Sequence, residues 1–201
     1  WLTVKRLQQI NWYKLYPQEI QNELLFQHIK DCENTEWGKK YNFKDIVSAE
    51  DFQKNVPIND YEGLKPYIER IRDGEQNILW HSPIKWFAKS SGTTNDKSKF
   101  IPVSKEALDD CHYRAGRDTA LLYNHNYPDS NVLTGKSLAL GGSHQIDQIS
   151  YDSYSGDLSA ILIQNLPFWA EFYRTPNISI ALMSEWEEKI QKIAEITSEE
   201  N

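Results

Sequence analysis

The chain has 201 residues, of which 39% are hydrophobic and 12% aromatic, a composition typical of a folded protein. Lys and Arg number 22 against 29 Asp and Glu, and the resulting formal charge of −7 argues against non-specific binding of nucleic acid, which needs a basic face. No apolar run approaches the roughly 18 residues that a membrane-spanning helix needs, so we expect no membrane partner. Cys32 and Cys111 form no CxxC pair, and we expect reduced thiols in a cytoplasmic protein. The chain opens on Trp1 without a signal-peptide pattern, and we expect it to be a piece of a longer protein.

The first third of the sequence is expected to be helical. After Pro17, hydrophobic residues recur at three- and four-residue spacing, which is typical of an amphipathic helix, and Pro17 suits an early helical position. A short helix is expected over 48–54, with Ser48 as its N-cap.

A further helix is expected to end this helical lead-in. Asn59 and Glu62 are spaced as a capping box, which predicts a helix that runs to Arg72. Gly74 follows, and a glycine just beyond the last turn is a common way for a helix to end.

The pattern changes from helix to strand after about residue 77. Residues 84–89 and 100–103 are rich in strand-forming side chains, and each predicts a short strand. Pro102 predicts a sheet edge or a strand end, because proline has no N–H to donate to a neighbouring strand. Ser104 is expected to cap a long helix over about 105–125.

The last part of the chain continues the mixture of strands and helices. We expect a buried strand over 137–140 and a helical segment over 157–173 that is broken by Pro167. Phe168 and Trp169 are expected in the core. The sequence therefore predicts an α/β fold, in which a helical lead-in over about 1–76 precedes a mixed sheet with flanking helices over about 77–201.

The segment between the two predicted strands has the composition of a phosphate-binding loop. Residues 90–99 read Ser-Ser-Gly-Thr-Thr-Asn-Asp-Lys-Ser-Lys. Glycine allows backbone N–H groups to turn inward around an anion, hydroxyls donate to phosphate oxygens, and lysine supplies positive charge. It is not a Walker A loop, because position 97 is lysine where that motif has its second glycine. A solvated polar hairpin turn is the alternative interpretation.

The order of these residues resembles a known family. Ser-Ser-Gly-Thr-Thr followed by lysine resembles the signature loop of adenylate-forming enzymes, and the wider string over 87–102 is similar to the auxin-responsive-promoter family of acyl-acid amido synthetases. The stretches 35–41, 56–58, 61–64, 66–68 and 74–80 also follow in the order that this family shows.

The resemblance implies a fold and a reaction. The chain would be the N-terminal part, 1–201, of a single large adenylation domain. ATP with Mg²⁺ would activate a carboxylic acid as an acyl-adenylate, which an amine such as an amino acid would then attack. By position in the motif, the residues that would bind the phosphates are Ser90, Ser91, Gly92, Thr93, Thr94 and Lys99. Lys99 would be the catalytic lysine, with Lys97 as an alternative, and no metal ligand is named.

The resemblance also shows what this chain does not contain. The family's adenine and ribose motifs and its mobile C-terminal domain lie downstream of the matching part, so we expect these 201 residues to be inactive alone. Two alternatives stay open: an adenylate-forming enzyme with a thiol acceptor, and a non-catalytic module that binds nucleotide or another protein.

Two other stretches carry residues of chemical interest. Gly141 and Gly142 precede His144 after a predicted strand, where α/β sheets often bind ligands, although a simple glycine turn is the alternative. Arg114 and Arg117 can share a helix face and bind a carboxylate substrate, or can be solvated surface charges.

Overall fold

The computed structural model describes residues 2–90, 98–142 and 146–199. The chain forms two compact units, the first comprising Trp1–Ile71 with Glu75–Ile84 and the second comprising Arg72–Gly74 with Lys85–Asn201. The predicted change from helical lead-in to sheet at about residue 77 falls close to this division. The assignment of both parts to one adenylation domain stays a prediction.

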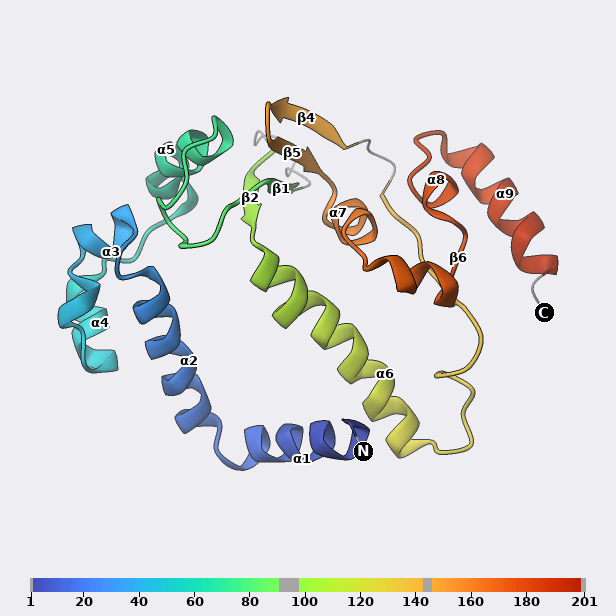
Figure 1. The fold of residues 1–201 in the computed structure, drawn as a ribbon, viewed down its shortest axis with the longest axis horizontal. Coiled ribbons are helices and arrows are strands. Elements are labelled where there is room, and N and C mark those ends of the chain that lie inside the picture. Colours follow the sequence, from blue (N-terminus) through green and yellow to red (C-terminus); the bar gives the residue numbers. More distant parts are fainter. Residues whose placement is uncertain (1, 91–97, 143–145, 200–201) are drawn as a thin grey trace. The chain divides into compact units, whose positions relative to one another are not determined.

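The first unit is built from helices, as the sequence predicts. Its elements are α1 (Leu2–Leu15), α2 (Pro17–Cys32), α3 (Glu36–Lys40), the 3₁₀ turn η1 (Phe43–Asp45), α4 (Ala49–Asn55) and α5 (Tyr61–Arg72), whose last residue belongs to the second unit (Figure 1). Pro17 is in the first turn of α2, and the Ser48 side chain accepts a hydrogen bond from the backbone N–H of Asp51. Both expectations are confirmed.

The N-terminal cap of α5 differs from the expectation by one residue. Asp60 Oδ1 accepts the backbone N–H of Gly63 at 2.8 Å, whereas the Asn59 side chain donates to the carbonyl of Pro57. Asparagine and aspartate are equally good N-caps, so residue type alone does not distinguish Asn59 from its neighbour Asp60. Gly74 has a φ of +108°, which agrees with its predicted place beyond the helix.

The core of the first unit lies between α2, η1 and the segment that follows η1. Its buried members are Ile29, Cys32, Phe43 and Ile46, and the half-buried ring of Trp80 packs against them. The buried side chains of α2 are on one face of the helix, as its hydrophobic spacing predicts.

The second unit contains two sheets and the helices that pack on them. Its elements are β1 (Trp86–Lys89), β2 (Phe100–Val103), the π-helical turn η2 (Ala107–Tyr113), α6 (Arg114–Asn126), β3 (Ser137–Leu138), β4 (Asp147–Ser150), β5 (Ser153–Gly156), α7 (Leu158–Gln164), the 3₁₀ turn η3 (Phe168–Tyr173), β6 (Arg174–Thr175), α8 (Ile178–Ala181) and α9 (Trp186–Glu199).

The larger sheet is mixed, and this confirms the predicted fold class. Its strands lie in the order β2-β1-β5-β4, with β1 antiparallel to β2 and parallel to β5 (Figure 1). Strand β4 is antiparallel to β5, and β3 pairs with β6 in a separate parallel pair. Helix α7 contacts β1 and β5, and the buried side chains Ala88, Val103, Leu108 and Ile161 form the core there.

Two expectations about burial in this unit are wrong. The segment 137–140 was expected as a buried strand, but β3 covers only Ser137–Leu138 and Leu138 is 55% exposed. Phe168 and Trp169 were expected in the core, but in η3 they are 81% and 51% exposed. An apolar run shows that a segment has hydrophobic side chains, but burial depends on distant parts of the chain that cover it.

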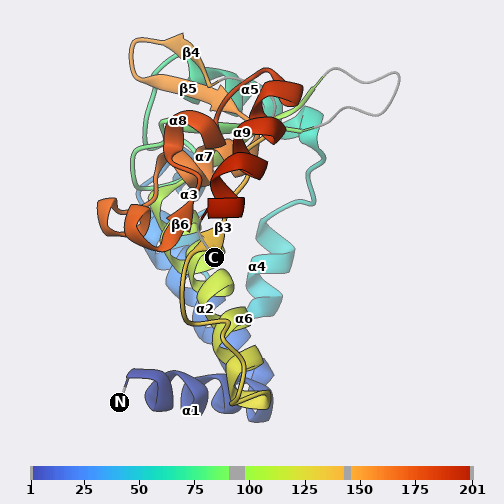
Figure 2. The same ribbon diagram turned by 90° about the vertical axis from the view of Figure 1, so that its right-hand side faces the viewer.

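Gly141 and Gly142 pass close to the helices that follow them in sequence. A Cβ on Gly142 would lie 1.9 Å from Asp157 Oδ2, and the Gly142 N–H donates to Ser159 Oγ at 2.9 Å. The fully buried Lys189 Nζ donates to the carbonyls of Gly141 and Gly142, at 3.1 and 3.2 Å. Burial lowers the pKa of Lys189. The glycines are therefore joined to α7 and to α9, which lies beside α8 (Figure 2).

Candidate phosphate-binding site

The predicted phosphate-binding segment starts and ends at the base of a β-hairpin. Strands β1 and β2 are antiparallel neighbours, and their last register pair is Lys89 with Phe100. One residue further on, the Ser90 N–H donates to the Lys99 carbonyl at 2.9 Å, and the Lys99 N–H donates to Ser90 Oγ at 3.1 Å. These two hydrogen bonds extend the pairing beyond the strands. We call Lys89, Ser90, Lys99 and Phe100 the hairpin base.

Two hydrogen bonds position Ser90 and Lys99 at the hairpin base. Ser90 Oγ accepts from a backbone N–H, so its own hydroxyl hydrogen remains available for a phosphate oxygen. Lys99 is fixed by its backbone, which means that the point from which its side chain extends is defined by the sheet. Phosphate binding needs this kind of fixed donor.

The other predicted members of the site lie outside the described residues: Ser91, Gly92, Thr93, Thr94, the alternative lysine Lys97 and the separate candidate His144. Their roles stay predictions. What the structure does place is Ser90 and Lys99, which it brings together although eight residues lie between them.

The hairpin lies at the edge of the larger sheet. Strand β2 is the edge strand, while β1 lies between β2 and β5. Pro102 is in β2, so its predicted edge position is confirmed. The fully buried Phe87 anchors β1 within the unit. The hairpin base is therefore attached to the sheet through β1.

Several basic side chains near these elements are already paired with carboxylates. Lys85 Nζ lies 2.6 Å from Asp152 Oδ2, and this hydrogen bond raises the pKa of Lys85. Arg114 pairs with Asp110 one turn earlier, whereas Arg117 is exposed. The structure therefore gives Arg114 an internal carboxylate partner, and the binding of a carboxylate substrate by Arg114 or Arg117 stays a prediction.

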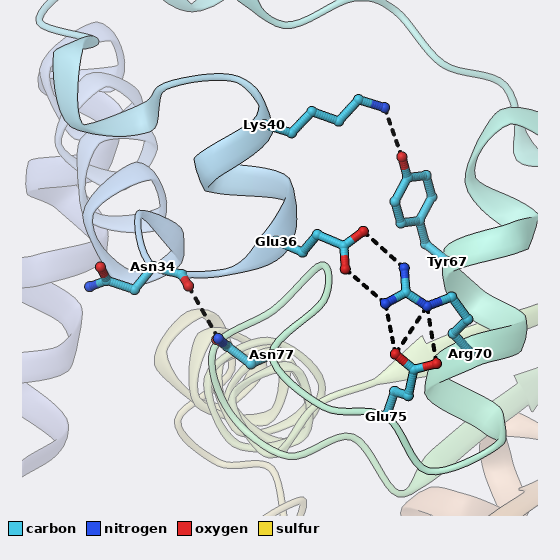
Figure 3. Close-up of polar contacts among 7 residues, drawn as sticks. All are labelled: Asn34, Glu36, Lys40, Tyr67, Arg70, Glu75 and Asn77. Atoms are coloured by element: carbon cyan, nitrogen blue, oxygen red, sulfur yellow. Dashed lines mark hydrogen bonds and ion pairs between the residues drawn. The ribbon is translucent and has the colours of Figure 1, made fainter.

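The family-like stretches of the first unit meet in one polar network (Figure 3). Arg70 Nη1 and Nη2 donate to the two carboxylate oxygens of Glu36, both at 2.8 Å, and Arg70 Nε and Nη2 donate to Glu75. These hydrogen bonds hold the pKa values of Glu36 and Glu75 below the usual range. The Asn77 side chain donates to the carbonyl of Asn34 at 3.1 Å. The network joins α3, α5 and the segment after α5.

Lys40 makes a second contact between α3 and α5. Its Nζ donates to the Tyr67 hydroxyl at 2.7 Å, and it lies 5.2–5.4 Å from the ring centroids of Trp37, Tyr41 and Tyr67 (Figure 3 shows Lys40 and Tyr67). The hydrogen bond from Lys40 to Tyr67 raises the pKa of Lys40. Sequence reasoning quoted these residues as motif positions but gave them no role. The contact between Lys40 and Tyr67 spans 27 positions, and no local signal reveals such a pair.

Metal ligands are not grouped in the described ranges. Within residues 2–90, 98–142 and 146–199, no three His, Cys, Asp or Glu side chains are placed to hold an ion. In the same ranges, no helix is long and apolar enough to cross a membrane.

Nearly the whole chain matches one known protein family. The family described as "GH3 family N-terminal domain" matches residues 6–201. The chain belongs to the GH3 family. The resemblance to acyl-acid amido synthetases inferred from the 87–102 string is thereby confirmed.

Curated relatives of this GH3 chain are amide-forming ligases. It is 36% identical over 107 residues to indole-3-acetic acid-amido synthetase GH3.2 of Arabidopsis thaliana, which is 53% of this chain and 20% of that protein. It is 31% identical over 121 residues to jasmonoyl–L-amino acid synthetase JAR4 of Nicotiana attenuata, 60% of this chain and 20% of that protein. The chain thus spans about a fifth of the length of these relatives.

A solved structure shares the fold. The GH3.15 acyl acid amido synthetase superposes with a TM-score of 0.70 at 22% sequence identity, over 86% of this chain and 30% of that one. A second structure of the same protein, in complex with 2,4-DB, gives a TM-score of 0.68 at 21% identity, over 87% of this chain and 30% of that one. The helical lead-in and mixed sheet are therefore the fold of this family's N-terminal part.

Proposed function

We propose that this chain is the phosphate-binding part of an ATP-dependent acyl-acid amido synthetase. The proposal rests on one observation above the others. Ser90 and Lys99, the first and last residues of the family-like loop, are hydrogen-bonded to each other at the base of a hairpin. The similarity to an indole-3-acetic acid-amido synthetase and to a jasmonoyl–L-amino acid synthetase supports amide formation as the overall reaction.

The proposed reaction has two steps. A carboxylate oxygen of the acid attacks the α-phosphorus of ATP, the bond from that phosphorus to the bridging oxygen breaks, and pyrophosphate leaves with the electron pair. The amine nitrogen of the second substrate then attacks the acyl carbon, the bond from carbon to the phosphate oxygen breaks, and AMP leaves while the nitrogen loses a proton. The products are an amide, AMP and pyrophosphate.

This chain's residues act in the first step. Negative charge grows on the departing pyrophosphate, and fixed donors aimed at such charge lower the barrier. Ser90 donates its hydroxyl hydrogen and Lys99 donates an ammonium N–H to the phosphate oxygens. By motif position, the other phosphate-binding residues are Ser91, Gly92, Thr93 and Thr94. Lys99 is the catalytic lysine of the proposal, because its charge offsets the charge that develops.

Magnesium enters this proposal through the phosphates. Mg²⁺ keeps several waters and is commonly held by one or two carboxylates together with substrate phosphates. The described residues, which hold no cluster of three candidate ligands, fit that mode better than a dedicated protein cage. The ion would supply charge neutralisation at the phosphate oxygens.

The test is acid-dependent exchange of pyrophosphate into ATP by the intact protein to which this chain belongs. A panel of carboxylic acids should include at least one that drives exchange, and addition of amino acids should then yield an amide. Ser91→Ala, Thr93→Ala and Lys99→Ala should each lower exchange by about tenfold or more. Thr119→Ala is the matched control, because its hydroxyl is exposed and donates only to the Ala115 carbonyl one turn earlier.

The outcomes separate the alternatives. Exchange followed by thioester formation with no amide would assign a thiol acceptor in place of an amine. Binding of ATP with no exchange for any acid would favour the non-catalytic module. If the melting temperature of the loop variants falls in parallel with their activity, the loop has a structural role.

A further inference from the structure

Arg72 holds its guanidinium at the hairpin base. Arg72 Cζ lies 3.9 Å from the centroid of the Phe100 ring, which places the planar cation directly against the aromatic face. Both residues belong to the second unit. Phe100 is the first residue of β2 and follows Lys99 directly, so the ring that carries Arg72 is itself a member of the hairpin base.

Among the described residues, no carboxylate is paired with Arg72, in contrast to Arg70 and Arg174. Arg70 binds the carboxylates of Glu36 and Glu75, and the buried Arg174 binds Glu171 and the Pro176 carbonyl. Arg72 Nε is buried without a hydrogen-bond partner, and among the described residues no carboxylate is paired with its guanidinium. An arginine is always charged, and a buried donor without an acceptor costs free energy.

The charges around Arg72 are favourable for an anion. Lys89 is exposed and lies opposite Phe100 in the strand register, and Lys99 adjoins Phe100 in sequence. Three cationic side chains therefore belong to or touch the hairpin base, in a chain whose formal charge is −7. Asp73 is exposed and is not paired with Arg72 in the part of the chain that the structure describes.

We propose that Arg72 is a further phosphate-binding residue, which holds a pyrophosphate group together with the hairpin base. The inference rests on the proposed function and deepens it. A guanidinium presents a rigid fork of donors that matches two oxygens of one phosphate. The Phe100 ring supports one face of the guanidinium and limits its rotation, so less side-chain entropy is lost when the phosphate binds.

Two ligands share this chemistry, inorganic pyrophosphate and the terminal phosphates of ATP. Isothermal titration calorimetry of the intact protein to which this chain belongs, with each ligand in the presence of Mg²⁺, measures both affinities. Arg72→Leu keeps an apolar side chain against Phe100 and removes the charge. It should weaken the binding of both ligands by about tenfold or more, because a charge-assisted hydrogen bond contributes roughly 1.5–3 kcal/mol.

Arg6→Leu is the matched control. Arg6 also stacks on an aromatic ring, with Cζ 5.6 Å from the Tyr13 centroid, and it lies in α1 of the first unit. Its removal changes the net charge by the same amount and should leave both affinities unchanged. Arg72→Lys keeps the charge without the fork and should weaken binding severalfold, so it carries the test if Arg72→Leu fails to fold by circular dichroism.

The possible results point to different conclusions. If the unaltered protein, Arg72→Leu and Arg72→Lys bind pyrophosphate and ATP with the same affinity, the role of Arg72 is overturned. The hairpin proposal then remains intact. Equal losses in Arg72→Leu and Arg6→Leu would also overturn it, since net charge alone would then explain the effect. Failure of the unaltered protein to bind either ligand would overturn the phosphate site as a whole.

Discussion

Gly38 of α3 is the position where one methyl group should have the clearest effect on stability. A Cβ built there would lie 2.0 Å from the backbone oxygen of Cys32 and 2.9 Å from its carbonyl carbon. Ordinary contact begins near 3.4 Å, so a Gly38→Ala variant needs about 1.4 Å of backbone displacement. The Cys32 carbonyl also accepts the Thr35 N–H at 3.0 Å and the Thr35 hydroxyl at 2.7 Å, so moving it strains both bonds.

The magnitude follows from these contacts. Overpacking in a dense region costs about 1–3 kcal/mol, and each weakened hydrogen bond adds about 0.5–1.5 kcal/mol. With both Thr35 hydrogen bonds weakened, we therefore expect Gly38→Ala to lower the free energy of unfolding by about 2–6 kcal/mol. Helix propensity by itself predicts the opposite sign, because alanine in a helix interior is favoured over glycine by about 1 kcal/mol.

Gly116 in α6 gives the matched control. No atom lies within 4 Å of the position that its Cβ would occupy, so Gly116→Ala should raise the free energy of unfolding by about 0.5–1 kcal/mol. Urea unfolding followed by circular dichroism measures both variants, and amide hydrogen exchange assigns each change to the first or the second unit. An unchanged or raised midpoint for Gly38→Ala would refute the close approach of α3 to Cys32.

Three other predictions test separate contacts. The pKa values of the two glutamates bound to Arg70 lie below their ordinary 4.5, so their contribution to folding is complete above pH 4.5 and is lost as the pH falls through the lowered values. The urea midpoint of the first unit should therefore fall as the pH is lowered. If the midpoint of Arg70→Met falls by the same amount, the pairing of Arg70 with the two glutamates is not the cause. Lys189→Met keeps the packing of the stem but leaves two glycine carbonyls without their donor, which should cost about 1–3 kcal/mol in urea unfolding; an unchanged midpoint would show that these bonds contribute nothing net. Cys111 is exposed and Cys32 is buried, so a thiol reagent should label one cysteine rapidly and the other only on unfolding; two rapid reactions would argue against the buried position.

Features set by neighbouring residues could be predicted from the sequence. Ser48 and Ser104 accept N–H groups three residues later, as N-caps do. The two strands on either side of the family-like loop are antiparallel neighbours, and Pro102 lies in the edge strand. In each case the cause is local backbone chemistry, which a short stretch of sequence carries.

Features set by distant residues could not be predicted. The Leu138 side chain is apolar, yet its exposure depends on the pairing of β3 with β6, which lies 37 positions later in the register. The contact between Arg70 and Glu36 joins residues 34 positions apart. Hydrophobic periodicity and capping patterns carry no information over such separations.

The candidate site shows both cases. The order of hydroxyl, glycine and lysine residues over 90–99 indicated phosphate chemistry, and the structure places its two described ends side by side. Arg72 was expected only as the end of a helix, because nothing in the sequence indicates that its guanidinium stacks on Phe100. That contact depends on how the end of α5 meets β2.

The attachment of Lys189 to Gly141 and Gly142 constrains the order in which the second unit can mature during synthesis. The donor is made 48 residues after the first carbonyl that it binds. A nascent chain that has emerged only as far as α8 has the glycine pair but not the ammonium that holds it. The two hydrogen bonds at these glycines therefore form only after Lys189, near the start of α9, has left the ribosome.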